Sequence, residues 1–174
     1  KRLEKKLLRM VERPTDHDPV FQAVHRIFHR DADLVLTREE KDAEKRKSVR
    51  ERAERRYMHG CPPRKHNDTS YGDALNWEWM IDCAVSKNAE LVIVSRDADY
   101  GATHDGKSYI NDHLWHEFSN RVSKKRKLLL YTKVSDALKH FKVPVTQAQV
   151  AAEKELVDEE KNKPIGLDEF DVIH

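Results

Sequence analysis

The chain has 174 residues, the length of about one domain, and 37% of them are charged, against about 25% in an average globular protein. No apolar run approaches the roughly 18 residues of a membrane-spanning helix, and Cys61 and Cys83 form no CxxC pair. The sequence as given therefore predicts neither a membrane span nor a disulfide framework, and we expect a cytoplasmic protein.

The net charge of +2 conceals an uneven distribution. Residues 37–66 hold 11 Lys/Arg against 6 Asp/Glu, a net charge of +5, whereas residues 146–174 hold 3 against 8, a net charge of −5. A basic segment of this kind attracts polyanions such as nucleic acids. A charged helix with few apolar residues is as often only a solvated surface with i,i+4 pairs such as Glu51 with Arg55, and both interpretations stay open.

The first third of the chain is predicted to be helical. Apolar residues at helical spacing indicate amphipathic helices over residues 3–11 and 20–28. Thr37 with Glu40 three positions later forms a capping box, which predicts a charged helix over residues 38–56 that ends near the His-Gly pair before the two prolines.

Helices and strands then alternate. Ser70 with Asp73 forms a second capping box and opens a predicted helix over residues 72–86. The almost purely aliphatic residues 90–95 and 128–132 are typical of parallel strands buried on both faces.

Three further helices complete the predicted elements. One covers residues 111–123, between the two strands, and Ser135 is expected to cap a short helix that follows the second strand. Thr146 with Gln149 forms a capping box for a last, increasingly acidic helix.

This order of elements predicts an α/β fold with a short parallel sheet. Two parallel strands are not a stable core by themselves, so we expect at least one further strand. It could lie upstream of residue 1, in the weaker segment 33–36, or in another chain. We favour the first of these, since the sequence opens in what reads as the middle of a helix.

Three carboxylates are candidate site residues. Ligands of parallel sheets bind beyond the carboxyl ends of the strands, and Asp97 and Asp99 follow the first predicted strand directly. Asp73 shares a helix face with Trp77 and is therefore aimed at the sheet, whereas Glu78, about 140° away around the helix, is expected to face solvent. The less favoured alternative is that Asp73 is a capping acid and Asp97 a turn residue.

If these carboxylates converge, their oxygens suit a hard divalent cation such as Mg²⁺ or Mn²⁺. Such ions activate water and neutralise charge on a phosphate, which is the chemistry of phosphodiester cleavage. Basic residues beside them, at Arg64, Lys65 and Arg96, would attract and position a phosphate backbone.

The segment over residues 57–141 resembles the PIN-domain nucleases, in particular bacterial PIN-like proteins with a Pro-Pro loop. The residues that carry the resemblance are Pro62-Pro63, the Gly72-Asp73-x-x-x-Trp77 helix start, and the run Leu91 to Tyr100 with its Ser-Arg-Asp-Ala-Asp end. The resemblance implies a three-layer α/β/α fold and a metal-dependent nuclease, most often an endoribonuclease.

The resemblance also implies roles for individual residues. Asp73 would be the third acid of the family's site and Asp97 the fourth, with Asp99 auxiliary and Ser95 orienting a carboxylate or a phosphate. The family's first two acids have no counterpart in this sequence, so the first strand and these acids are expected upstream. We assign residues 1–145 to the PIN-like domain, with residues 37–60 as a charged insertion, and residues 146–174 to an acidic helical extension.

Two other classes of function compete with a nuclease. A zinc site is one, because His25 and His29, His113 and His116, and Cys61 and His66 stand close in sequence, although no HExxH or paired CxxC accompanies them. The stronger rival is a non-catalytic module that binds nucleic acid or protein through a degenerate site.

The tryptophans could stack on bases, but aromatic residues at helical spacing are more often core. The resemblance to PIN-domain proteins also implies that the chain could form homo-oligomers or bind an inhibitory partner protein, as in toxin-antitoxin pairs. We predict a PIN-like nuclease that acts on nucleic acid, with RNA as the expected substrate.

Overall fold

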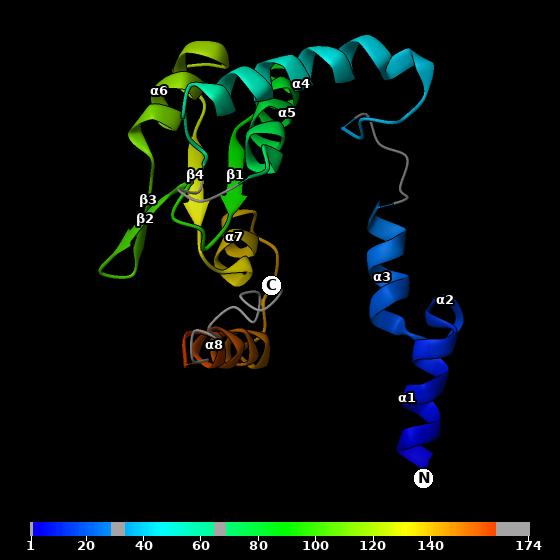
Figure 1. The fold of residues 1–174 in the computed structure, drawn as a ribbon. Coiled ribbons are helices and arrows are strands. Elements are labelled where there is room, and N and C mark those ends of the chain that lie inside the picture. The colour runs from blue at the N-terminus through cyan, green and yellow to red at the C-terminus, as the bar shows by residue number, and fades with distance from the viewer. Residues whose placement is uncertain (1, 29–33, 65–68, 163–174) are drawn as a thin grey trace, which may run out of the picture. The chain divides into compact units, whose positions relative to one another are not determined.

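The computed structural model of the chain describes residues 2–28, 34–64 and 69–162 (Figure 1). The chain divides into two compact units, Lys1–Arg46 and Lys47–His174. Within the described ranges, no helix is both long enough and apolar enough to cross a membrane.

The N-terminal unit is helical. α1 (Arg2–Glu12), the short α2 (Pro14–His17) and α3 (Pro19–Phe28) follow one another, and α2 contacts both of its neighbours. The carboxylate of Asp18 accepts two backbone amides of the first turn of α3 and caps that helix. The two predicted amphipathic helices are thus confirmed, although their apolar side chains are largely exposed within this unit.

The charged helix begins later than predicted. A 3-10 turn, η1 (Glu40–Asp42), precedes α4 (Ala43–Met58). The hydroxyl of Thr37 donates to the Asp42 carboxylate at 2.5 Å, and the Thr37 amide donates to the same oxygen at 2.9 Å. The predicted capping box with Glu40 is therefore wrong, because the chain makes an extra 3-10 turn and Asp42 becomes the partner. The helix ends before Gly60 as predicted, where a positive φ of 67° turns the chain.

α5 (Gly72–Lys87) confirms the helix predicted over residues 72–86. Its N-cap residue is Tyr71, which makes no side-chain capping hydrogen bond, so the helix begins one residue later than the predicted N-cap at Ser70 would place it. The helix ends at Asn88, whose left-handed backbone (φ 45°) receives the chain before the first strand.

The two predicted strands are confirmed as β1 (Leu91–Val94) and β4 (Leu128–Tyr131), which pair in parallel with Leu91 opposite Leu128. The chain thus has the predicted α/β fold with a short parallel sheet (Figure 1). β1 is not buried on both faces as predicted, since Val94 is 43% exposed. The strand suggested at residues 33–36 is absent from residues 34–36, the part of that segment that the structure describes.

One hydrophobic core binds the sheet to its helices. α6 (Asp112–Arg121) confirms the helix predicted over residues 111–123, and the Asn111 side chain caps it by accepting the His113 amide at 2.9 Å. The buried side chains that fill the core come from α5, α6, both strands and the loop after β1: Trp77, Ile81, Ala84, Ile93, Tyr100, Leu114, Phe118, Leu128 and Leu130.

A β-hairpin that the sequence analysis did not predict lies between β1 and α6. It consists of β2 (Gly101–His104) and β3 (Lys107–Ile110), which pair in antiparallel fashion, and β3 also contacts β4. The turn residues Asp105 and Gly106 have φ of 48° and 73°, as a two-residue type I′ turn requires.

The C-terminal elements are α7 (Val134–His140) and α8 (Gln147–Asn162). The prediction that Ser135 caps α7 is wrong. The Glu153 carboxylate of α8 caps this helix instead, because it accepts the amides of Val134 (2.6 Å) and Ser135 (3.1 Å). The capping box that opens α8 is confirmed. The Thr146 amide donates to the Gln149 side chain at 2.9 Å, and the Gln149 amide donates back to the Thr146 hydroxyl at 3.3 Å.

Candidate functional site

The acid loop, residues 95–100, leaves the sheet at the carboxyl end of β1. The Ser95 amide donates to the Tyr131 carbonyl at 2.9 Å and extends the pairing with β4 by one residue. The Ser95 hydroxyl then accepts the Asp97 amide at 3.1 Å, which closes a tight turn. Asp97 is exposed on this turn and Asp99 is half-buried, so the loop presents two carboxylates at the edge where parallel sheets bind their ligands.

α5 supplies the third predicted acid. Asp73 lies in its first turn and is half-buried, and Trp77, one turn later on the same face, is completely buried in the core. The prediction that this face of α5 packs on the sheet is therefore confirmed for Trp77. This burial also identifies Trp77 as a core residue and removes it from the aromatic side chains that could stack on bases.

Tyr100 connects the three acids electrostatically. Its ring belongs to the core, and only 6% of the residue is exposed. Burial raises the pKa of the Tyr100 hydroxyl, and the negative charges of Asp73, Asp97 and Asp99 add to this effect, so that the pKa is about 12. All three predicted acids therefore act on one buried hydroxyl, which stays protonated at neutral pH.

The donor chemistry of these acids suits Mg²⁺ or Mn²⁺, since carboxylate oxygens are the ligands that such hard cations prefer. Among the described residues, no three His, Cys, Asp or Glu side chains come close enough together to hold a metal ion. The assignment of Asp73, Asp97 and Asp99 as metal ligands therefore stays a prediction, as does the zinc alternative, whose His29 and His66 lie outside the described residues.

The basic residues assigned to a phosphate backbone are only partly placed. Arg64 is exposed, and its guanidinium lies over the Tyr57 ring at 4.7 Å from the ring centroid. Arg96 is exposed on the acid loop, one residue before Asp97. Lys65 lies outside the described residues, and the hydroxyl of Ser95 holds the turn of the acid loop.

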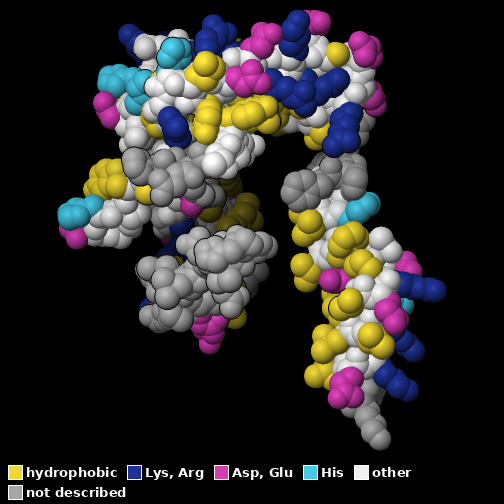
Figure 2. All heavy atoms as spheres, viewed as in Figure 1, with side chains coloured by type: hydrophobic (Ala, Val, Ile, Leu, Met, Phe, Trp, Pro, Cys, Tyr) yellow, Lys and Arg dark blue, Asp and Glu magenta, His cyan; other side chains and the backbone are white. Residues whose placement is uncertain are grey.

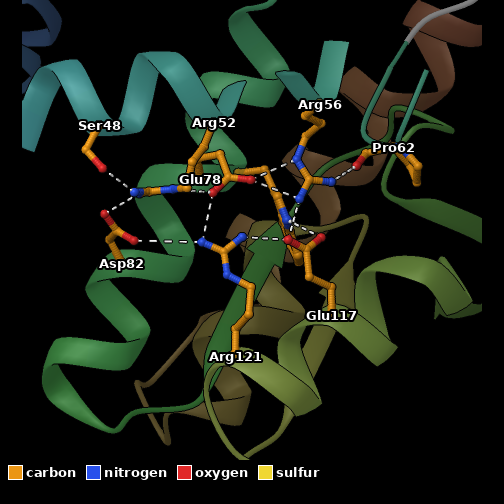
Figure 3. A network of polar contacts seen from close by, with 9 residues as sticks. Ser48, Arg52, Arg56, Pro62, Glu78, Asp82, Glu117 and Arg121 are labelled. Carbon is orange, nitrogen blue, oxygen red and sulfur yellow. Dashed lines mark hydrogen bonds and ion pairs between the residues drawn. The ribbon is translucent and has the colours of Figure 1, made fainter. Parts of the chain in front are cut away.

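A buried ionic network is the feature that sequence reasoning missed (Figure 3). Glu78 was predicted to face solvent, but it is only 2% exposed, so that prediction is wrong. Its carboxylate accepts the guanidinium groups of Arg52 and Arg56 from α4, both at 2.9 Å, and of Arg121 from α6 at 2.8 Å. Burial disfavours ionisation of Glu78, but the hydrogen bonds and charges of the three arginines outweigh it and hold its pKa below the usual value.

Glu117 and Asp82 complete this network. Glu117 contacts Arg56, accepts Arg121 at 2.6 Å and accepts the Trp77 indole N–H at 3.0 Å, while Asp82 accepts Arg52 at 2.6 Å. α4 is thus not only a solvated surface, because one side of it is buried against α5. The signal available in the sequence was the helical spacing of Val49, Ala53 and Arg56, all of which are buried.

A family model described as a PIN domain matches residues 35–100. This segment is similar to PIN domains. The matched range contains Asp73, Asp97 and Asp99, and it also contains residues 37–60, which we had assigned to an insertion. No curated protein and no solved structure matches the chain. This similarity supports a nuclease-type fold for the segment that holds the three acids.

Proposed function

We propose that this chain belongs to a metal-dependent nuclease that hydrolyses phosphodiester bonds, and that it cuts RNA internally. One observation carries the proposal. Within the PIN-like segment, Asp97 and Asp99 lie on the loop that leaves the carboxyl end of β1 and Asp73 lies in the first turn of α5, and the negative charges of all three raise the pKa of the same buried residue, Tyr100. Carboxylates gathered beyond the end of a parallel strand are the arrangement that a nuclease of this kind needs.

Asp73 and Asp97 are the proposed metal ligands, and Asp99 is a weaker third. Bound Mg²⁺ or Mn²⁺ would supply an activated water molecule and neutralise negative charge on the phosphate. The Tyr100 hydroxyl, whose pKa burial raises to about 12, adds no negative charge beside the three carboxylates at neutral pH.

The basic residues are proposed to bring the polymer to this edge. Arg64, Lys65 and Arg96 attract phosphates, and Ser95 lies at the base of the same loop. Contacts of this type position a nucleic acid without reading its sequence. We therefore expect an affinity that depends strongly on salt and weakly on base composition.

A non-catalytic nucleic-acid-binding module is the second candidate function. It is favoured by the observation that the described carboxylates, although they share an electrostatic environment, do not form a group of three close enough for a metal ion. Such a module would keep its affinity for nucleic acid and cut nothing.

Cleavage of labelled single-stranded RNA and DNA separates the two candidates. The protein is incubated with Mn²⁺, with Mg²⁺ and with EDTA, beside Asp97→Asn and beside Asp158→Asn, a matched control at an exposed aspartate of α8. We expect metal-dependent cutting, of RNA in preference to DNA, that Asp97→Asn lowers by roughly 100-fold or more and Asp158→Asn leaves unchanged. Cutting that persists in EDTA or in Asp97→Asn contradicts the proposal, and binding without cutting moves the assignment to the second candidate.

A further inference from the structure

The β2–β3 hairpin begins immediately beside the acids. Gly101, its first residue, follows Tyr100, whose hydroxyl the three aspartates surround electrostatically. The Asn111 amide donates to the Tyr100 carbonyl at 2.8 Å and ties the far end of the hairpin back to the same place. Both ends of the hairpin are thus anchored at the acid loop, while its turn reaches away from the core (Figure 1).

The two faces of the hairpin differ in character. In β3, Lys107 and Tyr109 are exposed, whereas Ser108 and Ile110 alternate with them and Ile110 packs against the core. The strand register places Ala102 opposite Tyr109 and His104 opposite Lys107. These four residues therefore share one face, the outer face of the hairpin, because directly opposed residues in an antiparallel pair project to the same side.

This outer face combines an accessible aromatic ring with a cation. Tyr109 is 53% exposed, and the residue opposite it, Ala102, is too small to cover its ring. Among the described residues, no aromatic ring stacks on Tyr109. The hairpin contains a single acid, Asp105, which lies in the turn and contacts His104 at 3.4 Å. Figure 2 shows hydrophobic and histidine side chains at the surface where the hairpin projects.

Distance along the chain favours a nucleic acid that reaches the acid loop. Ala102 lies three residues after Asp99, so the backbone between them spans at most about 10 Å at roughly 3.3 Å per residue. A stacked strand of nucleic acid advances about 3.4 Å per nucleotide, so about three nucleotides cover this span. A single strand with one phosphate at the acid loop can therefore reach Ala102, the residue opposite Tyr109, within about three nucleotides.

We propose that the outer face of the hairpin, formed by Tyr109, Lys107 and His104, is a contact surface for single-stranded nucleic acid. Tyr109 stacks on a base about three nucleotides from the phosphate at the acid loop, and Lys107 contacts the backbone. The placement of that phosphate rests on the proposed function, whereas the stacking contact requires no cleavage. A stacked base is sequence-tolerant, because every base offers a π-face.

Binding in EDTA tests the surface independently of catalysis. The anisotropy of a labelled single-stranded oligonucleotide of about ten nucleotides, within the usual site size of stacking platforms, is measured with wild type, Tyr109→Ala, Tyr109→Phe and Phe141→Ala. Phe141 is a matched control, since it is 55% exposed and lies next to His140, which pairs with Glu90 at the opposite end of β1.

We expect Tyr109→Ala to weaken binding by roughly 5- to 150-fold, the equivalent of losing one stacked base. Tyr109→Phe and Phe141→Ala should bind as the wild type does, and Lys107→Met should lower the slope of log affinity against log salt by about 1. Wild-type affinity in Tyr109→Ala, an equal loss in Tyr109→Phe or Phe141→Ala, or no binding by the wild type overturns the inference.

The cleavage assay and the binding assay can refute the nuclease and the hairpin surface separately. A wild type that cuts nothing, together with a Tyr109→Ala variant that binds more weakly, would refute the nuclease and support the hairpin surface. Metal-dependent cutting by the wild type, together with unchanged binding in Tyr109→Ala, would support the nuclease and refute the hairpin surface. Far-UV circular dichroism of Tyr109→Ala checks that the exposed substitution leaves the fold intact.

Discussion

Replacement of Glu78 by glutamine tests the buried network most directly. The change keeps the size of the side chain and removes one negative charge. The network holds three guanidinium groups, of Arg52, Arg56 and Arg121, and three carboxylates, of Glu78, Asp82 and Glu117, so its formal charge is balanced. Glu78→Gln leaves one excess positive charge at a place where Arg56 is only 8% exposed.

Removing one partner of a buried ion pair typically lowers the free energy of unfolding by about 3–5 kcal/mol, because the remaining charge is left without compensation. For a chain of this length, each kcal/mol lowers the melting temperature by about 2–4 °C, so the expected change is roughly 6–20 °C. Urea unfolding followed by tryptophan fluorescence measures the free energy, and a thermal scan by circular dichroism measures the melting temperature.

Glu54→Gln, at an exposed position of α4, is the matched control and should stay within about 0.5 kcal/mol of the wild type. Adding Arg121→Gln to Glu78→Gln restores the charge balance. The double variant should therefore lose less than the sum of the single losses, with a coupling of about 0.5–3 kcal/mol. The reasoning is refuted if Glu78→Gln costs no more than Glu54→Gln, or if the two losses simply add.

Three further predictions concern other parts of the C-terminal unit. The folded-state pKa of Glu78 lies below its ordinary value of 4.5, so its contribution to stability is present above that pH and is lost as pH falls through the lower folded-state pKa. In urea titrations, wild-type stability should therefore drop more steeply below about pH 4.5 than that of Glu78→Gln. Gly101→Ala would place a methyl group 2.0 Å from the Tyr109 carbonyl oxygen and should lower the free energy of unfolding by about 1–3 kcal/mol through crowding. Gly106→Ala has open space but a φ of +73°, and it should lower the free energy of unfolding by about 1–2 kcal/mol through backbone strain alone. Hydrogen exchange of the hairpin amides compares the two variants, and an equal increase in both would contradict the crowding expected at Gly101. Glu153→Ala removes the cap of α7 and should lower the free energy of unfolding by about 1 kcal/mol, against no change in Glu155→Ala.

The strands and several helix starts could be read from the sequence because their signals are local. An unbroken aliphatic run gave β1 and β4, and the reciprocal pair Thr146 and Gln149 closes as its spacing predicts. Two other helix starts were misplaced, since a 3-10 turn moved the start of α4 and Tyr71 became the N-cap of α5. A cap supplied from a distant helix, as Glu153 supplies it to α7, leaves no local trace.

The hairpin and the network were missed for different reasons. The Asp105-Gly106 turn was a readable signal, but the four-residue strands beside it are polar and resemble a loop. Glu78 was misplaced because a helical wheel was given one buried direction, whereas α5 is covered by the sheet on one side and by α4 on another. For the candidate site, strand topology predicted where Asp97 and Asp99 would lie, but their joint effect on Tyr100 depends on side-chain positions that no spacing rule provides.

The balanced network also bears on how this sequence can diverge. Loss of Glu78 alone leaves a buried guanidinium without a compensating charge, and loss of Arg56 alone leaves carboxylates without one. Either change on its own is therefore expected to be selected against. Simultaneous replacement by apolar residues of similar volume removes all of the stranded charge and is often neutral. In related sequences, all six positions of the network should therefore covary and should switch between ionic and apolar sets as a group: Arg52, Arg56, Glu78, Asp82, Glu117 and Arg121.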